Sequence, residues 1–243
     1  MLNIWPEFGL IPAVMPRYRA LWGWAVVIGL GLAACSQATP SVQEDSIRYV
    51  ALGDSYTIGT SVAAADSWPS QLVARVPQLA LVANLGVNGY TSGSLIPSEL
   101  PALDELAPDF VTLQIGVNDV VQRFPESAYV RNVEEILDDL LGRLDPDRVL
   151  CVATPDYTVT PQGSAFGSPE EQRAGIERVN AILGDACEAR GIRFVPDIFA
   201  ISQAATDSSM LALDGLHPSG AQYALWVDAI QPVVEELLLP SAD

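Results

Sequence analysis

Short hydrophobic runs alternate with amphipathic helical patterns along most of this chain. Nearly continuous apolar runs bounded by turn residues predict five strands, at 47–53, 79–86, 109–116, 148–155 and 192–198. Apolar residues that recur every three or four positions predict helices at 67–76, 97–107, 127–144, 168–191 and 218–238. Strands that are apolar on both faces and separated by helices indicate a parallel sheet covered on both sides.

The segment before the first strand breaks this alternation. Arg17 and Arg19 precede an apolar run that ends in Leu32-Ala33-Ala34-Cys35, a pattern typical of a secretory signal. The run is shorter than the ~20 residues needed to span a bilayer, although an uncleaved anchor helix is the alternative interpretation. The polar stretch 36–45 lacks periodicity and is predicted to be a tether.

The residues Leu32-Ala33-Ala34-Cys35 also resemble the lipobox of bacterial lipoproteins. This resemblance implies a signal peptide at 1–34, a lipidated tether at 35–46 that begins with Cys35, and a folded domain at 47–239. It implies an extracytoplasmic protein anchored to the bacterial cell envelope. An aspartate directly after the cysteine would resemble an inner-membrane retention signal, but residue 36 is a serine. The outer membrane is therefore expected where two membranes are present.

Composition excludes some classes of partner. Apolar residues make up 49% of the chain and charged residues 17%, as in globular proteins. The formal net charge is −18, and none of the 12 basic residues is a lysine. This charge repels nucleic acid and anionic lipid headgroups, so neither is expected as a partner.

Two cysteines lie inside the predicted domain. Cys151 lies early in a predicted strand, and Cys187 lies late in the helix that leads to the next strand, so both are expected at one end of the sheet. Outside the cytoplasm they could form a disulfide. The alternative is a pair of buried free thiols, and the sequence favours neither.

Residues capable of chemistry follow the ends of the predicted strands. Gly53-Asp54-Ser55 follows the first strand, Asn84–Gly89 the second, Gly116–Asp119 the third, and Asp214–Pro218 precedes the last helix. Each motif alone is an ordinary turn sequence. Because ligands bind at the carboxyl ends of parallel strands, four such motifs at one edge predict an active site.

His217 is the only histidine in the chain, and Asp214 precedes it by three residues in a turn with Gly215. That spacing allows the carboxylate to orient the ring through Nδ1 and leaves Nε2 free to accept a proton. A metal site is not expected, because there is no second histidine and the cysteines are not clustered.

The order GDSYTIG, NLGVNG, GVND and DGLHP resembles the SGNH hydrolases, also called the GDSL esterase/lipase family. The resemblance covers the whole predicted domain, and the one departure is GDSY in place of GDSL. It implies that Ser55 is the nucleophile, His217 the general base and Asp214 its orienting acid. It also implies an oxyanion hole made by the N–H groups of Ser55 and Gly86 and the amide of Asn118. The implied fold is a flavodoxin-like three-layer α/β/α sandwich with a five-stranded parallel sheet, and no cofactor is implied.

The expected activity is therefore that of a serine esterase acting on a small-molecule ester. Short-chain acyl, lysophospholipid-like and acetylated substrates all fit the resemblance. A carbohydrate O-acetyltransferase or deacetylase is the alternative enzyme, and a non-catalytic binding module is the third interpretation. The loop 155–169 could form a wall of the acyl site through Tyr157 and Phe166, or it could be a surface loop.

Overall fold

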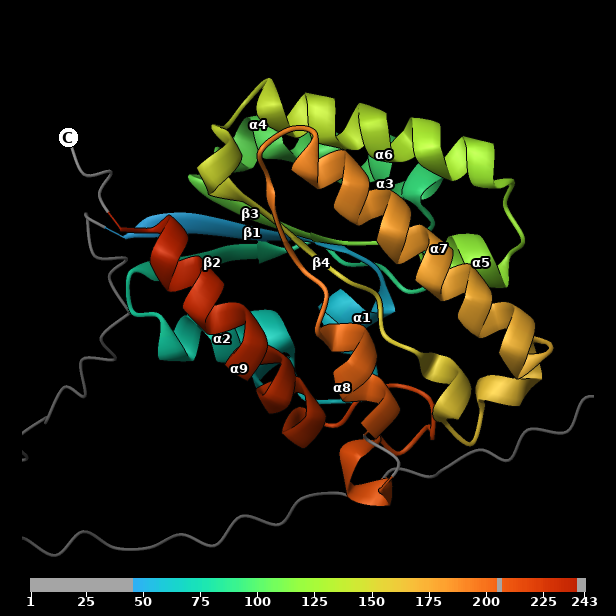
Figure 1. Ribbon diagram of the computed structural model, residues 1–243. Helices are drawn as coiled ribbons and strands as arrows, with labels where there is room; N and C mark the ends of the chain where they lie inside the picture. Colours follow the sequence, from blue (N-terminus) through green and yellow to red (C-terminus); the bar gives the residue numbers. More distant parts are fainter. Residues whose placement is uncertain (1–45, 205–206, 240–243) are drawn as a thin grey trace, which may run out of the picture. The chain divides into compact units, whose positions relative to one another are not determined.

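Five parallel strands form the centre of the protein, and the computed structural model describes residues 46–204 and 207–239 (Figure 1). The strand order is β2-β1-β3-β4-β5, which is the flavodoxin-like order, so the predicted fold class is confirmed. All five predicted strands are present; β1 has the predicted bounds, and the other four are shorter than predicted. The strands are β1 (Ile47–Gly53), β2 (Leu79–Asn84), β3 (Phe110–Gln114), β4 (Val149–Val152) and β5 (Arg193–Val195).

Helices cover both faces of the sheet because neighbouring side chains of a strand point to opposite faces. Tyr49 and Ala51 of β1 belong to the hydrophobic layer that includes side chains of α2 (Trp68–Arg75) and α9 (Gly220–Leu237). Val50 and Leu52 belong to the opposite layer, with side chains of α3 (Ser92–Ser98), α6 (Glu126–Leu141) and α7 (Pro169–Glu188). Figure 1 shows α2 and α9 on one side of the strands and α3 and α6 on the other.

The helix predicted at 97–107 is wrong in its bounds. Helix α3 begins earlier, because Thr91 caps it by accepting a hydrogen bond from the Ser94 N–H, 3.2 Å. A short 3₁₀ helix, η2 (Leu100–Ala102), then contains Pro101 and separates α3 from α4 (Leu103–Leu106). The predicted interruption of this helix at Pro101 is confirmed, since proline removes a backbone donor.

Three short helices were not predicted from the pattern, namely α1 (Ser55–Ile58), α5 (Val117–Val121) and α8 (Ile198–Ala204). Helices α1 and α5 follow directly after β1 and β3, so they lie at the edge where the candidate motifs meet. The remaining elements are short 3₁₀ helices: η1 (Ala64–Asp66), η3 (Pro146–Arg148), η4 (Tyr157–Val159), η5 (Gly163–Phe166) and η6 (Ser208–Met210).

None of the helices within residues 46–204 and 207–239 has the length and apolarity needed to cross a bilayer. The predicted leader and the predicted lipidation site at Cys35 lie outside the described residues.

Candidate active site

Ser55 lies in a tight turn at the carboxyl end of β1. The Asp54 carbonyl accepts hydrogen bonds from the N–H groups of Thr57 (3.1 Å) and Ile58 (3.0 Å), and its side chain accepts one from Tyr56 N–H (2.9 Å). Asp54 is therefore the cap that starts α1 immediately after the strand. Ser55 is the first residue of that helix, where an N–H group has no acceptor within the helix.

Asp214 holds the ring of His217. Its Oδ2 lies 2.7 Å from His217 Nδ1 and also accepts a hydrogen bond from Ser61 Oγ, 2.6 Å. Its Oδ1 accepts hydrogen bonds from the N–H groups of Leu216 and His217, both at 2.9 Å. Partial burial opposes ionisation of Asp214, but these hydrogen bonds outweigh it and lower the pKa of the carboxyl group. Asp214 is thus a stable carboxylate that orients the imidazole.

The ring of His217 is also fixed by packing. The ring centroids of His217 and Tyr56 lie 5.0 Å apart, and the His217 carbonyl accepts a hydrogen bond from the Ala212 N–H, 2.8 Å. Since Nδ1 lies against Asp214, Nε2 is the ring nitrogen left for a substrate or for Ser55.

Ser55, Asn118 and His217 line one pocket of about 50 Å³. The sequence places these residues far apart, and the fold brings them together at the carboxyl edge of the sheet, as expected. Tyr157 and Phe166 line the same pocket, and their rings meet edge to face at 5.6 Å. The loop after β4 therefore forms a wall of the pocket, although Tyr157 itself is nearly buried.

The amide of Asn118 is held at the start of α5. Its Nδ2 donates to the Tyr90 carbonyl at 2.9 Å and to Asp54 Oδ2 at 3.3 Å. The first bond has ordinary length, whereas the second is longer than the usual range. A negatively charged oxygen in the pocket could replace the longer bond.

Two buried carboxyl groups support these loops. Burial raises the pKa of Asp54 to about 7, and the charge of Asp119 adds to this rise, while hydrogen bonds from Tyr56 and Asn118 oppose it. Asp119 accepts hydrogen bonds from the N–H (2.9 Å) and Oγ (2.6 Å) of Ser92, and burial raises its pKa. Both residues brace loops and do not line the pocket.

The structure does not support Gly86 as an oxyanion donor. Its N–H donates to Asn84 Oδ1 at 3.2 Å. A Cβ at this position would lie 2.7 Å from the Asp54 carbonyl oxygen and 2.7 Å from the Ile58 nitrogen, so glycine allows β2 to approach the nucleophile turn closely.

Gly89 lies in open space, unlike Gly86, and the sequence motifs did not predict it as an oxyanion donor. Its φ is +79°, and no atom lies within 4 Å of the place where a Cβ would be. Neighbouring Tyr90 accepts the hydrogen bond of Asn118, and the Gly89 carbonyl accepts one from Gln122 Nε2, 2.9 Å. The Asn-Gly turn sequence at 88–89 was the signal that could have identified it.

Cys151 and Cys187 are buried free thiols in this structure. Burial raises the pKa of the Cys151 thiol, and a hydrogen bond with Cys187 raises it further, so the two side chains are neighbours. The disulfide between them, one of the two alternatives that the sequence leaves open, stays untested.

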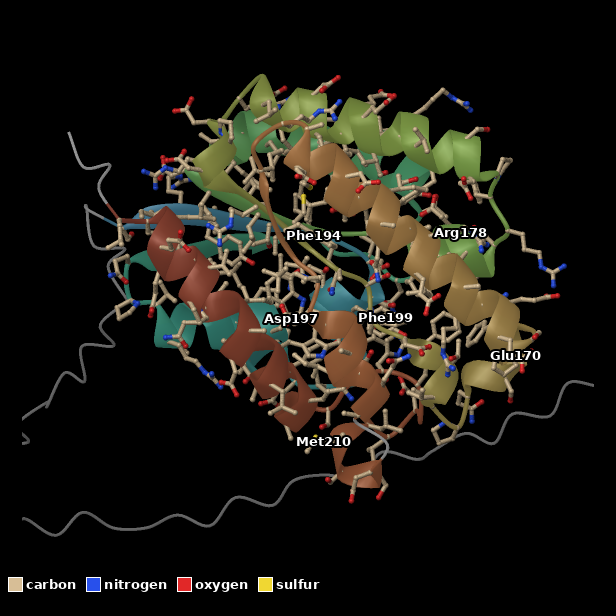
Figure 2. All side chains as sticks on the ribbon, viewed as in Figure 1. Glu170, Arg178, Phe194, Asp197, Phe199 and Met210 are labelled. Atoms are coloured by element: carbon tan, nitrogen blue, oxygen red, sulfur yellow. The ribbon has the colours of Figure 1, made fainter. Side chains whose placement is uncertain are left out.

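A hollow much larger than this pocket lies away from the site. It measures about 710 Å³ and is formed by side chains of α7, β5 and α8, including Phe194 and Phe199, both labelled in Figure 2. Neither Ser55, Asn118 nor His217 lines it, so chemistry and not size identifies the candidate site. Within residues 46–204 and 207–239 there is no cluster of three or more side chains suited to a metal ion.

Comparisons with known proteins find relatives in sequence and in fold. An arylesterase from Vibrio mimicus is 29% identical over 116 residues, which cover 46% of this chain and 54% of the relative, so the chain spans about half of that relative. A lipase/acylhydrolase from Enterococcus faecalis has a TM-score of 0.65 at 20% identity, over 81% of this chain and 100% of that chain. Axe2, an acetylxylan esterase from Geobacillus stearothermophilus, has a TM-score of 0.59 at 16% identity, over 79% and 96%. These structures share the fold.

The model of the GDSL-like lipase/acylhydrolase family matches residues 51–225, a span that includes Ser55, Asn118, Asp214 and His217. The match covers well over half of the chain. The chain therefore belongs to the GDSL-like lipase/acylhydrolase family, which confirms the family predicted from the sequence motifs.

Proposed function

We propose that this protein hydrolyses carboxylic esters through a triad of Ser55, His217 and Asp214. One observation carries the proposal: Ser55, Asn118 and His217 line a single pocket, and Asp214 fixes the tautomer and orientation of the His217 ring. A hydroxyl, a base and an amide donor around one cavity are the groups that acyl transfer requires.

The reaction proceeds in two halves. Ser55 Oγ attacks the ester carbonyl while His217 Nε2 takes its proton, and the carbonyl electrons move onto oxygen. As the oxyanion collapses, the bond to the alcohol breaks and His217 gives its proton to the departing alkoxide. Water then attacks the acyl-Ser55 ester by the same route, which releases the carboxylic acid and restores the serine.

The oxyanion is stabilised by three N–H donors in this proposal. The Ser55 N–H has no acceptor within α1, and the Asn118 amide donates its longer bond towards the same turn. Gly89 replaces Gly86 as the third donor, because the Gly86 N–H is already bonded to Asn84. Each such donor typically supplies about 2.7–4 kcal/mol of transition-state stabilisation.

Short acyl groups are the proposed substrates. The small pocket is closed on one side by Tyr157 and Phe166, which leaves little room for a long chain. The acetylxylan esterase neighbour supports an ester of a small acid. Tyr157 and Phe166 act in this proposal as contacts for the acyl group.

We also propose that the protein is lipidated at Cys35 and anchored outside the cytoplasm to the bacterial cell envelope, in the outer membrane where two membranes are present. The apolar run that ends in Leu32-Ala33-Ala34-Cys35 supports this location. Mass spectrometry of membrane-extracted protein is expected to find a diacylglyceryl group on Cys35 and no peptide from 20–34. An intact 20–34 segment would contradict it.

The activity is tested by steady-state hydrolysis of p-nitrophenyl acetate, butyrate and octanoate by the purified protein and by Ser55→Ala. We expect kcat/KM to be highest for acetate and Ser55→Ala to show only background hydrolysis. Adding an acetylated sugar and an acceptor sugar distinguishes hydrolysis from acetyl transfer. A Ser55→Ala protein that retains a tenth of wild-type kcat would contradict the proposed nucleophile.

A further inference from the structure

The turn Gly53-Asp54-Ser55, called the nucleophile turn, makes a hydrogen bond that has no part in the proposed mechanism. At the end of β1, the Gly53 N–H donates to Glu99 Oε2, 2.9 Å. The regular pairing of β1 with β2 ends at Ala51 and Asn84, and Leu85 N–H then donates to the Ala51 carbonyl, 2.8 Å. The carboxyl group of Glu99 therefore takes the place of a strand acceptor where β2 turns away from β1.

Glu99 is almost completely buried. It follows the last residue of α3, its exposed fraction is 2%, and among the described residues its Oε1 has no hydrogen-bond partner. A buried polar atom without a partner costs free energy, so such an atom needs an explanation. If the only role of Glu99 were to end helix α3, its side chain would not need to be buried.

Protonation makes this burial tolerable. Burial raises the pKa of Glu99 to about 9; the Gly53 N–H opposes the rise, and the charge of Asp54 adds to it. Helix α3, SGSLIPS, contains no charged residue, and from β1 and its turn Asp54 is the charged group that acts on Glu99. At neutral pH Glu99 is therefore an uncharged acid beside the turn.

We propose that Glu99 is a positioning residue that holds the Ser55 turn through the Gly53 N–H. This inference rests on the proposed function, since it deepens the account of the same site. Gly53 is joined to Ser55 by Asp54 alone, and its carbonyl accepts a hydrogen bond from the Val87 N–H, 3.3 Å. One carboxyl group thus fixes both the nucleophile turn and the start of the loop that carries Gly89. Glu99 does not line the pocket and touches no reacting atom.

The chemistry explains why the support should be uncharged. A tetrahedral intermediate places negative charge next to Ser55, and a second buried negative charge behind the turn would oppose it. Above about pH 9 the ionised Glu99 would also repel Asp54, and the turn would shift. Small displacements of a positioned nucleophile cost large factors in rate.

The test compares Glu99→Ala, Glu99→Gln and the control Glu105→Gln, an exposed glutamate in α4, with the wild-type protein. The measurements are kcat and KM for p-nitrophenyl acetate from about pH 6 to about pH 10, corrected for base hydrolysis, together with thermal unfolding. Glutamine keeps an acceptor for the Gly53 N–H but cannot ionise, so it separates hydrogen bonding from charge.

Glu99→Ala is expected to lower kcat by about tenfold or more, with KM changed by less than about twofold. Glu99→Gln is expected to keep most of the neutral-pH kcat and to stay active above about pH 9, where the wild-type and Glu105→Gln proteins lose activity. If Glu99→Ala does not fold, the alkaline limb of Glu99→Gln decides the question.

A Glu99→Ala protein with wild-type kcat, or a Glu99→Gln protein with the same alkaline decline as wild type, overturns the inference. If Ser55→Ala is inactive while Glu99→Ala is fully active, the positioning role fails and the proposed function stands. If the wild-type protein hydrolyses no ester, the proposed function fails and the positioning role falls with it.

Discussion

The turn that carries Ser55 and the loop that carries Asp214 and His217 shift the pKa values of their carboxyl groups in opposite directions. Behind the turn, Asp54 and Glu99 are buried, and burial raises their pKa values to about 7 and about 9. In the loop, Asp214 is more exposed and receives four hydrogen bonds, from Ser61 Oγ, His217 Nδ1 and the N–H groups of Leu216 and His217. Its pKa is lowered.

The difference shows that burial, opposed by the number of hydrogen-bond donors, sets the pKa of each carboxyl group. Asp214 must be ionised, because an imidazolium forms beside it during the reaction. Glu99 has one donor and one unpartnered oxygen, and it supports the backbone without adding charge behind the oxyanion. The Asp214 carboxylate therefore stabilises the imidazolium that forms on His217 during the reaction, while the uncharged Glu99 adds no negative charge behind Ser55.

The largest predicted loss of activity concerns the loop that carries Asp214 and His217. His217→Ala removes the only base and is expected to lower kcat by about a thousandfold or more, while KM changes little. Steady-state hydrolysis of p-nitrophenyl acetate measures this, with circular dichroism to check folding. A folded variant that keeps a tenth of the activity would show that another group takes the serine proton.

Asn118→Ala is expected to lower kcat by roughly a hundredfold, with a much smaller change in KM, because an oxyanion donor acts mainly in the transition state. The same assay measures it. An equal rise in KM with unchanged kcat would mean that Asn118 binds the ground state and does not belong to the oxyanion hole.

The two regions should also differ in how pH changes stability. Glu99 has a pKa raised from 4.5 to about 9 on folding, so between these values the native protein holds a proton that the unfolded chain has lost. The contribution of Glu99 to the free energy of unfolding therefore falls as pH rises through this window. Asp214 has a lowered pKa, so its contribution is present above the ordinary value of 3.8 and is lost as pH falls below it.

Thermal unfolding of Glu99→Gln and wild type tests this contrast. The difference in Tm, variant minus wild type, is expected to increase by about 4 °C or more as pH rises from about 5 to about 8.5. A constant difference in Tm across that range would mean that Glu99 is ionised in the folded protein.

The smallest predicted effect is that of Ser61. Its hydroxyl donates to the same Asp214 oxygen as His217, and its φ of +67° is unusual for a residue other than glycine. Ser61→Ala removes one hydrogen bond to a charged group, so kcat is expected to fall by about threefold to tenfold. Ser98→Ala, on the exposed end of α3, is the matched control and should leave kcat unchanged.

The sequence was sufficient for the sheet because strand-length apolar runs and long amphipathic helices each carry a repeating pattern. Helices α1 and α5 were missed because each spans four or five residues, too few for a helical period to be visible. Those two helices carry Ser55 and Asn118, so the residues were identified from their motifs while their local structure was not.

The supporting contacts were beyond the sequence for a different reason. Glu99 and Gly53 are 46 residues apart, and nothing in the local pattern of either indicates that they meet. The same holds for Ser61 and Asp214, which are 153 residues apart. The sequence could not distinguish Gly86 from Gly89, because two glycines of one turn look alike until the acceptor of each N–H is known.

The most direct test of the central claim is labelling with a fluorophosphonate, followed by peptide mapping of the labelled protein. The account predicts one modified residue, Ser55, and predicts that labelling is lost in both Ser55→Ala and His217→Ala because the serine needs its base. An ester-hydrolysing protein that is labelled at another residue, or that remains unlabelled, would contradict the assignment of Ser55 as the nucleophile.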